Sequence, residues 1–327
     1  MFFTKQIHRV ALSFALAVSL PFVSNAREVA DTAGTAQPES FSTENTPERK
    51  PVLNICPMHP GADSSAVNLK IVRPVNSVFT LNIGGASILD TYLTPIRYSG
   101  INLRLGYERF QAMKFSPEKW IMQMGFGVSY ANVQNIVGNR TMHSLMVDFS
   151  WGMMHRWNLP GNFSLFAGGS TSFDGGVIYN QYNSNNPVSP KIRWNIAPTG
   201  MAAYSFRIKN TPVILRYQAT VPVIGIFFSP DYGEPLYEVW LGNTAGLVNC
   251  GSWANRFDMT NSLSADFRFG GTVLRIGYRN TIESSWVHNI NTQIYTHSFT
   301  VGVGGEIINL RADSGLSETC RIISAVY

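Results

Sequence analysis

The sequence predicts an all-β protein, an antiparallel transmembrane β-barrel of about ten strands that follows a signal peptide and a flexible leader. Three observations predict this fold. They are an N-terminal export signal, an apolar residue at every second position over most of the chain, and short connections that alternate with long ones. A version with about twelve strands stays open, in which "LYEVWLGN" supplies an additional hairpin arm.

Residues 1–26 have the pattern of a secretory signal peptide. Lys5 and Arg9 precede an apolar run from Val10 to Val23, and the small residue Ala26 marks the expected cleavage site. The run is short and interrupted by Pro21, which argues against a membrane-spanning helix. No later segment offers the roughly 20 consecutive apolar residues that such a helix needs. If the mature chain stays in a membrane, it therefore crosses as strands.

Residues 27–76 are expected to form a flexible periplasmic leader. Their first part, "REVADTAGTAQPESFSTENTPERK", is polar and has no apolar period, and the following part is rich in proline. The two-residue period then defines an outer-membrane β-barrel over residues 77–310. Residues 311–327 are left as a C-terminal tail.

The composition favours a surface in contact with lipid. Charged residues make up 14% of the chain, below the usual quarter, whereas aromatic residues reach 12%. The net charge of +5 comes partly from the leader, and the other arginines are scattered along strands, so nucleic-acid binding is not expected.

The three cysteines, Cys56, Cys250 and Cys320, are widely spaced and match no metal-binding pattern. One disulfide is compatible with them, and none is required. No cysteine follows the cleavage site, so a lipoprotein anchor at that position is not expected. The sequence thus indicates neither a metal nor another cofactor.

Ten segments alternate between apolar and polar residues and are expected to be strands. Pro198 makes the sixth of them an edge, a bulge or a misread strand. In chain order the segments are "VFTLNIGG", "INLRLGYE", "WIMQMGFGVSYA", "SLMVDFSWG", "FSLFAGGS", "NIAPTGMAAYSF", "VILRYQATV", "LSADFRF", "VLRIGYR" and "HSFTVGVGGEI".

The connections between these strands indicate a membrane barrel. "NLPGN", "RIKNTP" and "GG" are short, whereas long connections are expected at "VQNIVGNRTM", at "GGVIYNQYNSNNPVSPKI", over most of residues 223–256, and at "TIESSWVHNINTQ". Outer-membrane barrels have short periplasmic turns and longer extracellular loops, and a soluble sandwich has no reason to sort its loops in this way.

The alternation also assigns the two faces of the sheet. Unpaired charges in a dry core would cost several kcal/mol each, so the charged face fits a barrel lumen and the apolar face fits lipid. The expected lumen charges, five arginines and four acids, are Arg104, Glu108, Asp148, Arg216, Asp266, Arg268, Arg275, Arg279 and Glu306. The aromatic residues expected near the membrane interfaces are Tyr107, Trp120, Tyr130, Trp151, Trp157, Tyr217 and Tyr278.

One hairpin can be predicted residue by residue. If Gly270 and Gly271 form a two-residue turn, Phe269 pairs with Thr272, and Asp266 lies opposite Arg275. Both charges then face the lumen. A structural ion pair across the two strands is favoured over a role in selectivity.

The segments "FSPDYGEPLYEVWLGN", "LSADFRFGGTVLRIGYR" and "HSFTVGVGGEI" resemble a family of Gram-negative outer-membrane β-barrel proteins of unknown function, over about residues 75–310. The resemblance implies a location in the cell outer membrane and carries over no catalytic or ligand-binding residue. The sequence departs from the usual pattern of such barrels after the last strand. The barrel-assembly machinery usually recognises a terminal strand with an aromatic tip, but here "RADSGLSETCRIISAVY" follows.

No catalytic constellation is expected. His143 and Ser144, like His297 and Ser298, are immediate neighbours, so their side chains point to opposite faces of a strand. The protein is therefore not expected to be an enzyme. The alternative, a lipid-acting outer-membrane enzyme, requires a partner on a neighbouring strand.

The longest connection contains a group of acidic and aromatic residues. We interpret this segment as a folded loop or a gate, and the alternative is a site for a cation or a sugar. The residues are Asp231, Tyr232, Glu234, Tyr237, Glu238 and Trp240.

These features predict an outer-membrane barrel with at most a narrow solute passage, or a structural barrel with a plugged lumen. About ten strands lie between barrels that are filled by side chains and barrels that hold a water channel. The mixed lumen charges favour mutual pairing over selectivity for one sign of charge. The expected partners are outer-membrane lipid and the barrel-assembly machinery, and no motif indicates a particular solute or partner protein.

Overall fold

The computed structural model describes residues 70–184, 186–242, 246–307 and 320–326, all within the unit Cys56–Tyr327. The signal peptide, the leader up to residue 69 and residues 308–319 lie outside the described residues. Among the described residues, no helix has the length and apolar character needed to cross a bilayer, a finding that does not bear on crossing by strands.

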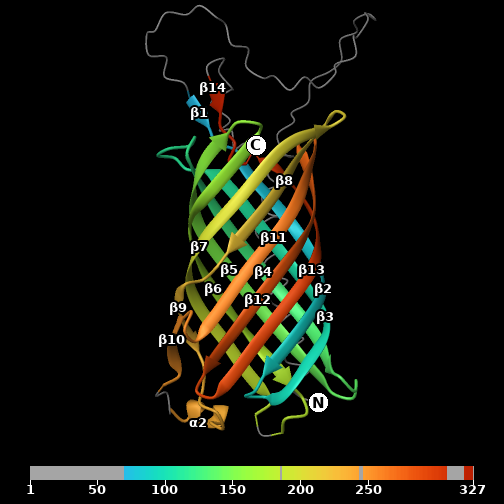
Figure 1. The fold of residues 1–327 in the computed structure, drawn as a ribbon, viewed down its shortest axis with the longest axis vertical. Helices are drawn as coiled ribbons and strands as arrows, with labels where there is room; N and C mark the ends of the chain where they lie inside the picture. The colour runs from blue at the N-terminus through green and yellow to red at the C-terminus, as the bar shows by residue number, and fades with distance from the viewer. Residues whose placement is uncertain (1–69, 185, 243–245, 308–319, 327) are drawn as a thin grey trace, which may run out of the picture. The chain divides into compact units, whose positions relative to one another are not determined.

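Ten antiparallel strands close into a barrel (Figure 1), which confirms the predicted fold. Each strand of the ring pairs with the next one along the chain, and β8 pairs with β11 because β9 and β10 lie outside the ring. β13 pairs with β2, which closes the ring. The ring strands are β2 (Val75–Asp90), β3 (Thr94–Ala112), β4 (Trp120–Asn135), β5 (Thr141–Leu159), β6 (Phe163–Asn180), β7 (Val188–Ile208), β8 (Thr211–Thr220), β11 (Arg256–Phe269), β12 (Thr272–Val287) and β13 (Ile290–Ile307).

Two further strands, β9 (Ile224–Phe228) and β10 (Val248–Ser252), form a hairpin beside the ring. β9 pairs with residues 193–196 of β7, beyond the residues of β7 that pair with β8. The sheet therefore has twelve strands, but the ring has ten. The alternative in which "LYEVWLGN" supplies a hairpin arm is wrong, because Leu236–Trp240 form the short helix α2. Outside the barrel, β1 (Lys70–Val72) pairs in parallel with β14 (Cys320–Ile322).

The predicted sorting of the connections is only partly correct. At the terminal end, where β2 begins and β13 ends, the connections span 113–119, 160–162, 209–210 and 270–271. At the loop end they span 91–93, 136–140, 181–187, 221–255 and 288–289. Most of the segments expected as long loops are strand, because the ladders continue beyond the runs of regular alternation. Only 221–255 is a long connection.

The apolar face of the sheet is its outer face. Ile101 and Leu105 are 64% and 65% exposed on the outside, whereas Asn82 and Asp266 are 2% and 0% exposed inside. Five of the expected interface aromatics are exposed on the outer face, namely Tyr130, Trp151, Trp157, Tyr217 and Tyr278. A continuous apolar outer belt around a polar interior is the arrangement of a transmembrane barrel.

The hairpin of β11 and β12 has the predicted register. Phe269 pairs with Thr272 and Asp266 with Arg275, around a turn in which Gly270 has a φ of 62°. A positive φ at this position suits glycine, which has no Cβ to clash with the backbone. The register places Asp266 and Arg275 on the lumen side, where both are buried.

We expect Leu105→Arg to block assembly of the barrel. The change places a charge in the apolar belt, at a cost of about 2–4 kcal/mol near the bilayer midplane. Ser99→Arg is the matched control, because Ser99 lies on the outer face of the same strand beyond the belt, between polar neighbours. The readout is the heat-dependent gel migration of each variant after refolding into lipid vesicles. If Leu105→Arg refolds as completely as Ser99→Arg, the outer face is not in lipid.

Candidate functional site

The lumen contains a polar chamber of about 260 Å³. Small hydroxyl-bearing side chains line much of it, which leaves room that larger side chains would fill. They include Ser129, Ser144, Ser170, Ser172, Thr260, Ser262, Ser264, Thr281, Thr296 and Ser298. The chamber is therefore the candidate binding site of the barrel.

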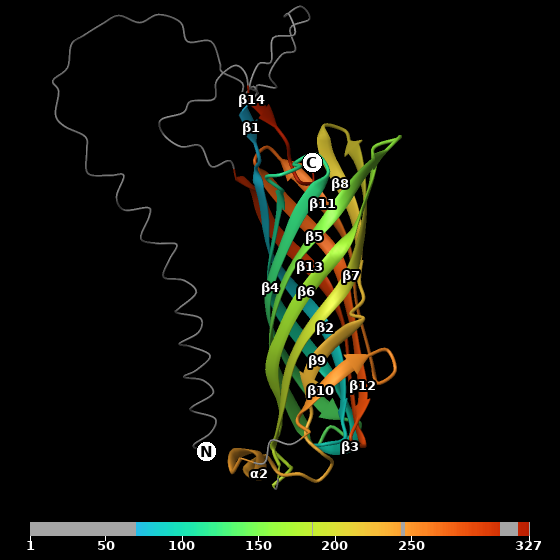
Figure 2. The same cartoon turned by 90° about the vertical axis from the view of Figure 1, so that its left-hand side faces the viewer.

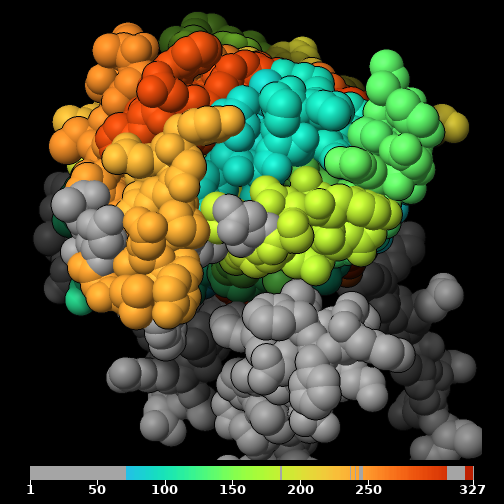
Figure 3. Space-filling view, turned by 90° about the horizontal axis from the view of Figure 1, so that it is seen from below, coloured from blue at the N-terminus to red at the C-terminus, as the bar shows by residue number. Residues whose placement is uncertain are grey.

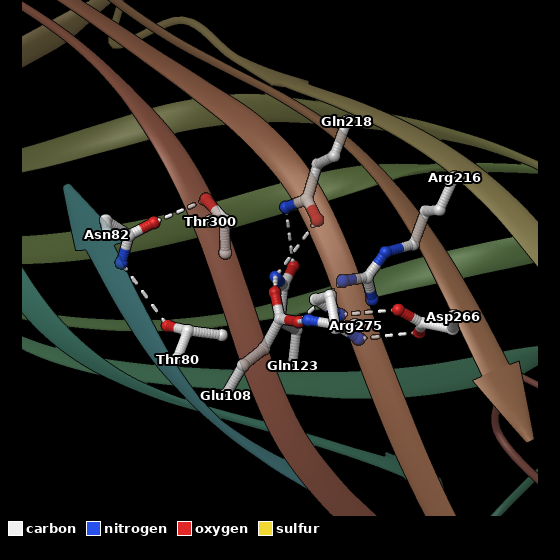
Figure 4. A network of polar contacts seen from close by, with 9 residues as sticks. All are labelled: Thr80, Asn82, Glu108, Gln123, Arg216, Gln218, Asp266, Arg275 and Thr300. Atoms are coloured by element: carbon white, nitrogen blue, oxygen red, sulfur yellow. Dashed lines mark hydrogen bonds and ion pairs between the residues drawn. The ribbon is translucent and has the colours of Figure 1, made fainter. Parts of the chain in front are cut away.

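One ion-pair network crosses the lumen near the terminal end (Figure 4). Glu108 on β3 accepts from Arg216 on β8 at 2.7 Å and from Arg275 on β12. Arg275 also donates from Nε and Nη2 to the two oxygens of Asp266, at 2.6 and 2.7 Å. Gln123 and Gln218 bond to each other beside this network. One carboxylate thus holds two guanidinium groups from the opposite wall.

A second ion pair joins Arg104 to Asp148, with 2.5 Å between Arg104 Nη2 and Asp148 Oδ2. Two inward-facing glycines make space for the guanidinium. A Cβ on Gly127 would overlap Arg104 Nη2, and a Cβ on Gly106 would lie 2.7 Å from Arg104 Nη1. Asn82 lies nearby and accepts from Thr300 at 2.6 Å.

A third group of charges lies toward the loop end. Arg193 pairs with Glu283 at 2.5 Å, and Arg256 pairs with Asp258 and donates to Asn195 Oδ1 at 2.8 Å. Asn195 in turn donates to Asp174 at 3.0 Å. None of these charges was predicted, because their positions fell in expected loops or beside irregular strands. Lys191 and Asp90 form another unpredicted pair, at 2.9 Å.

Two of the expected lumen arginines form no hydrogen bond within these networks. Arg268 pairs with Glu306 at 3.0 Å near the terminal end. Arg279 lines the chamber, and its guanidinium donates no hydrogen bond to any described residue. Ser262 and Ser298 flank Arg279 on the neighbouring strands. Among the described arginines that line the chamber, Arg279 is therefore the one whose guanidinium has no hydrogen-bond acceptor.

A cluster of buried apolar side chains lies at the loop end of the lumen, which loops cover (Figure 3). The buried cluster consists of Ala86, Ile88, Tyr92, Leu93, Tyr98, Ala131, Val133, Met142, Ile178, Ile290 and Ile294. We call it the loop plug. The Tyr92 hydroxyl donates to the backbone oxygen of Glu234 at 2.8 Å, which ties the long connection to this end.

The acidic and aromatic residues of the long connection do not converge on one site. Asp231 lies 2.9 Å from His288 Nδ1, at the turn between β12 and β13. Tyr232, Tyr237 and Glu238 are exposed, and the side chain of Trp240 lies outside the described residues. The described residues contain no group of His, Cys, Asp or Glu that could hold a metal ion.

A second buried apolar cluster lies at the terminal end of the lumen, and the C-terminal segment contributes to it. The cluster consists of Phe110, Ile121, Met154, Phe166, Met201, Ala203, Ile214, Ala325 and Val326. We call it the tail plug. Arg156 donates to the backbone oxygens of Ser324 and Ala325 at 3.0 and 3.3 Å, and Arg321 pairs with Glu118 at 2.6 Å. The segment left as a tail in the sequence thus enters the barrel.

The histidines of the strands do not form a catalytic pair with the adjacent serines. His143 faces outward, where Nδ1 lies 2.9 Å from the Tyr130 hydroxyl, whereas Ser144 is buried on the lumen side. His297 is likewise exposed and Ser298 buried. Cys250 is a free, exposed thiol, and Cys56 and the side chain of Cys320 lie outside the described residues.

We expect Asp266→Ala and Arg275→Ala to lower stability non-additively. Removing one partner of a buried ion pair leaves the other charge uncompensated, which lowers the free energy of unfolding by about 3–5 kcal/mol. Removing both partners leaves no unpaired charge within the pair. Asp148→Ala combined with Arg275→Ala is the control cycle, because these two side chains share no contact. The readout is the urea unfolding free energy of the refolded barrel. Strict additivity in the first cycle would show that Asp266 and Arg275 do not interact.

Several solved structures are similar to this chain at low identity. The beta domain of the Bordetella autotransporter BrkA is 10% identical, with a TM-score of 0.36 over 72% of this chain and 100% of that one. The Escherichia coli outer membrane protease OmpT is 8% identical, with a TM-score of 0.40 over 72% and 97%. The transport unit of the Escherichia coli autotransporter AIDA-I is 9% identical, with a TM-score of 0.38 over 77% and 93%. These likenesses assign no activity.

No curated protein sequence matches the chain. A family model matches residues 52–314, which is most of the sequence and includes the whole barrel. This match confirms the predicted resemblance to a family without a known activity. The chain belongs to the family described as protein of unknown function (DUF3316).

Proposed function

We propose that the protein is an outer-membrane β-barrel that is closed along its axis at rest and encloses a polar chamber between two apolar plugs. The observation that carries this proposal is the pair of buried clusters at the two ends of the lumen. Water and ions do not pass a dry apolar constriction, and the charges between the plugs are largely paired with one another. The plugged barrel is thus better supported than an open passage.

The outer surface supports the membrane location. Soluble monomers rarely expose a large contiguous apolar patch, whereas here the outer face is apolar around the ring. The terminal end fits the periplasmic side, because its turns are short and the leader and the C-terminal segment both reach the barrel there. The loop end, with its long connection, then faces outward.

A catalytic role is the weaker candidate. A lipid-acting enzyme needs a nucleophile and a base within hydrogen-bond reach of each other. His143 and His155 instead contact aromatic side chains on the outer face, Tyr130 for the first and Trp120 and Trp157 for the second. The chamber, with its paired charges, fits binding or storage of a polar group better than turnover.

The location has a direct test. We expect the full-length protein to be recovered with the outer membrane after cell fractionation and to migrate faster on gels before boiling than after, because a closed barrel resists unfolding by detergent. A matched marker protein of the periplasm serves as the control. Recovery of the protein with that soluble marker would overturn the membrane location.

The tail plug has a separate test, based on the reactivity of a buried position. Met201→Cys, in a background in which the native cysteines are serine, places a thiol in the tail plug. We expect slow labelling by a polar maleimide in the full chain and much faster labelling when residues 320–327 are removed. Leu105→Cys, on the outer belt, is the control whose labelling should not depend on the tail. Equal rates at Met201→Cys in both chains would show that the C-terminal segment closes nothing.

A further inference from the structure

The barrel wall has a seam on its loop-end half. The ladder between β8 and β11 stops at the pair Thr220–Thr260. Beyond it, residues 256–259 of β11 pair only with β12, and β9 pairs with β10 in place of β11. We call residues 221–224 and 256–259 the seam. Figures 1 and 2 show the hairpin of β9 and β10 beside the ring at this height.

Two prolines lie beside the break in the ladder. Pro222 has no N–H to donate, so it cannot continue the bonding toward β11. Pro198 lies on β7 where the register shifts by one residue, between Thr199–Thr220 and Ile196–Ile224. Val221 and Val223 still donate to Pro198 and Ile196 of β7, at 3.2 and 3.1 Å. The wall is therefore tied on the β7 side and open to separation on the β11 side.

The seam leads to the chamber. A small pocket lies in it, lined by residues that include Val223, Ile224 and Arg256. Asn195, Pro222 and Asp258 line both this pocket and the chamber. These three residues thus lie between the chamber and the pocket in the seam.

Side-chain contacts hold the seam closed. Arg256 donates to Asn195, pairs with Asp258, and lies 5.4 Å from the centre of the Phe227 ring. Trp253 Nε1 donates to the backbone oxygen of Pro222 at 3.0 Å. Rotamer changes break such contacts without unfolding a ladder. Asp258 is also buried, and its Oδ1 has no hydrogen-bond partner among the described residues, so it can accept a further hydrogen bond.

The two sides of the seam differ in chemistry. Outside, Ile224 and Trp253 are 58% and 63% exposed, and Phe257 is exposed beside them. Inside, Arg279 offers its guanidinium without a direct acceptor. Arg279 pairs in register with Ser262, which lies four residues along β11 from Asp258 at the seam, about 13 Å for an extended strand. An anionic head at Arg279 and a hydrocarbon tail leaving through the seam match this layout.

We propose that the seam is a lateral portal through which the chamber binds a single-chain amphiphile with a carboxylate head, of the fatty-acid type. Arg279 binds the carboxylate, Arg256 and Trp253 form the latch, and the tail extends toward lipid. The proposal rests on the membrane location proposed above, and fractionation tests that location separately. It does not require either plug to open.

The test uses palmitic acid with a photoreactive diazirine in its tail, added to the full-length barrel in lipid vesicles. We expect adducts, mapped by mass spectrometry, on peptides of the seam and the chamber. Arg279→Gln should lower this labelling about tenfold, the effect of losing a charged hydrogen bond. Arg207→Gln, an exposed arginine in β7 near the terminal end, is the matched control. The corresponding long-chain alcohol should label neither variant at these peptides.

The second part of the experiment closes the seam with a chemical cross-link and repeats the photolabelling. Val221→Cys and Met259→Cys, without the native cysteines, sit where the next pair of the ladder would form, and a short bis-maleimide joins them. Tyr217→Cys and Leu263→Cys join strands across the intact ladder as the control. We expect labelling to be lost in the first locked barrel and kept in the second.

Four outcomes would overturn the proposal. Labelling that persists with the seam locked would place the entry elsewhere. Equal labelling by the acid and the alcohol would indicate simple partitioning into lipid, and full labelling of Arg279→Gln would exclude it as the head-group ligand. If Arg279→Gln fails to refold, Ser298→Leu keeps the charge but fills the space beside it, and undiminished labelling of that variant would equally contradict the assignment.

Discussion

Ring closure is the constraint on which the rest of this structure depends. Once ten strands pair around a circle, every second side chain points into a narrow lumen, and any charge there must find a partner within that space. Glu108 shows the consequence most clearly. Its side chain extends from β3 into the lumen and forms ion pairs with Arg216 on β8 and Arg275 on β12. The pairing of inward charges in turn keeps the strands at their relative heights.

The alternating sequence predicts the ring and its faces because the period of a strand is a local property. It also predicts the contact between Asp266 and Arg275, since a two-residue turn at Gly270 and Gly271 fixes their register. The contact of Glu108 with both arginines was not predictable in the same way. It depends on strand tilt and on which strands face each other across the lumen, and no short segment encodes either.

Other parts were missed for identifiable reasons. Arg256 and Glu283 fall in segments expected as long connections, and the polar residues 260–262 separate Asp258 from the expected strand "LSADFRF". The tail plug was missed because "RIISAVY" follows a polar segment and resembles no further barrel strand. Its apolar residues gain a partner only when the barrel exists, since Ala325 and Val326 pack against side chains from several strands.

The parallel pair of β1 and β14 has a mechanical consequence. A force applied to the chain before Lys70 enters β1 at its first residue, whereas β14 is anchored at its far end, where Ile323 donates to Val72 and the following residues sit in the lumen. Parallel strands held in this way are loaded in shear, so their hydrogen bonds share the load and do not open one after another. Because only Arg73 and Pro74 separate β1 from β2, the covalent chain carries tension on the N-terminal segment directly into the barrel wall, and the ladder to β14 passes only a part of it to the C-terminal segment in the lumen.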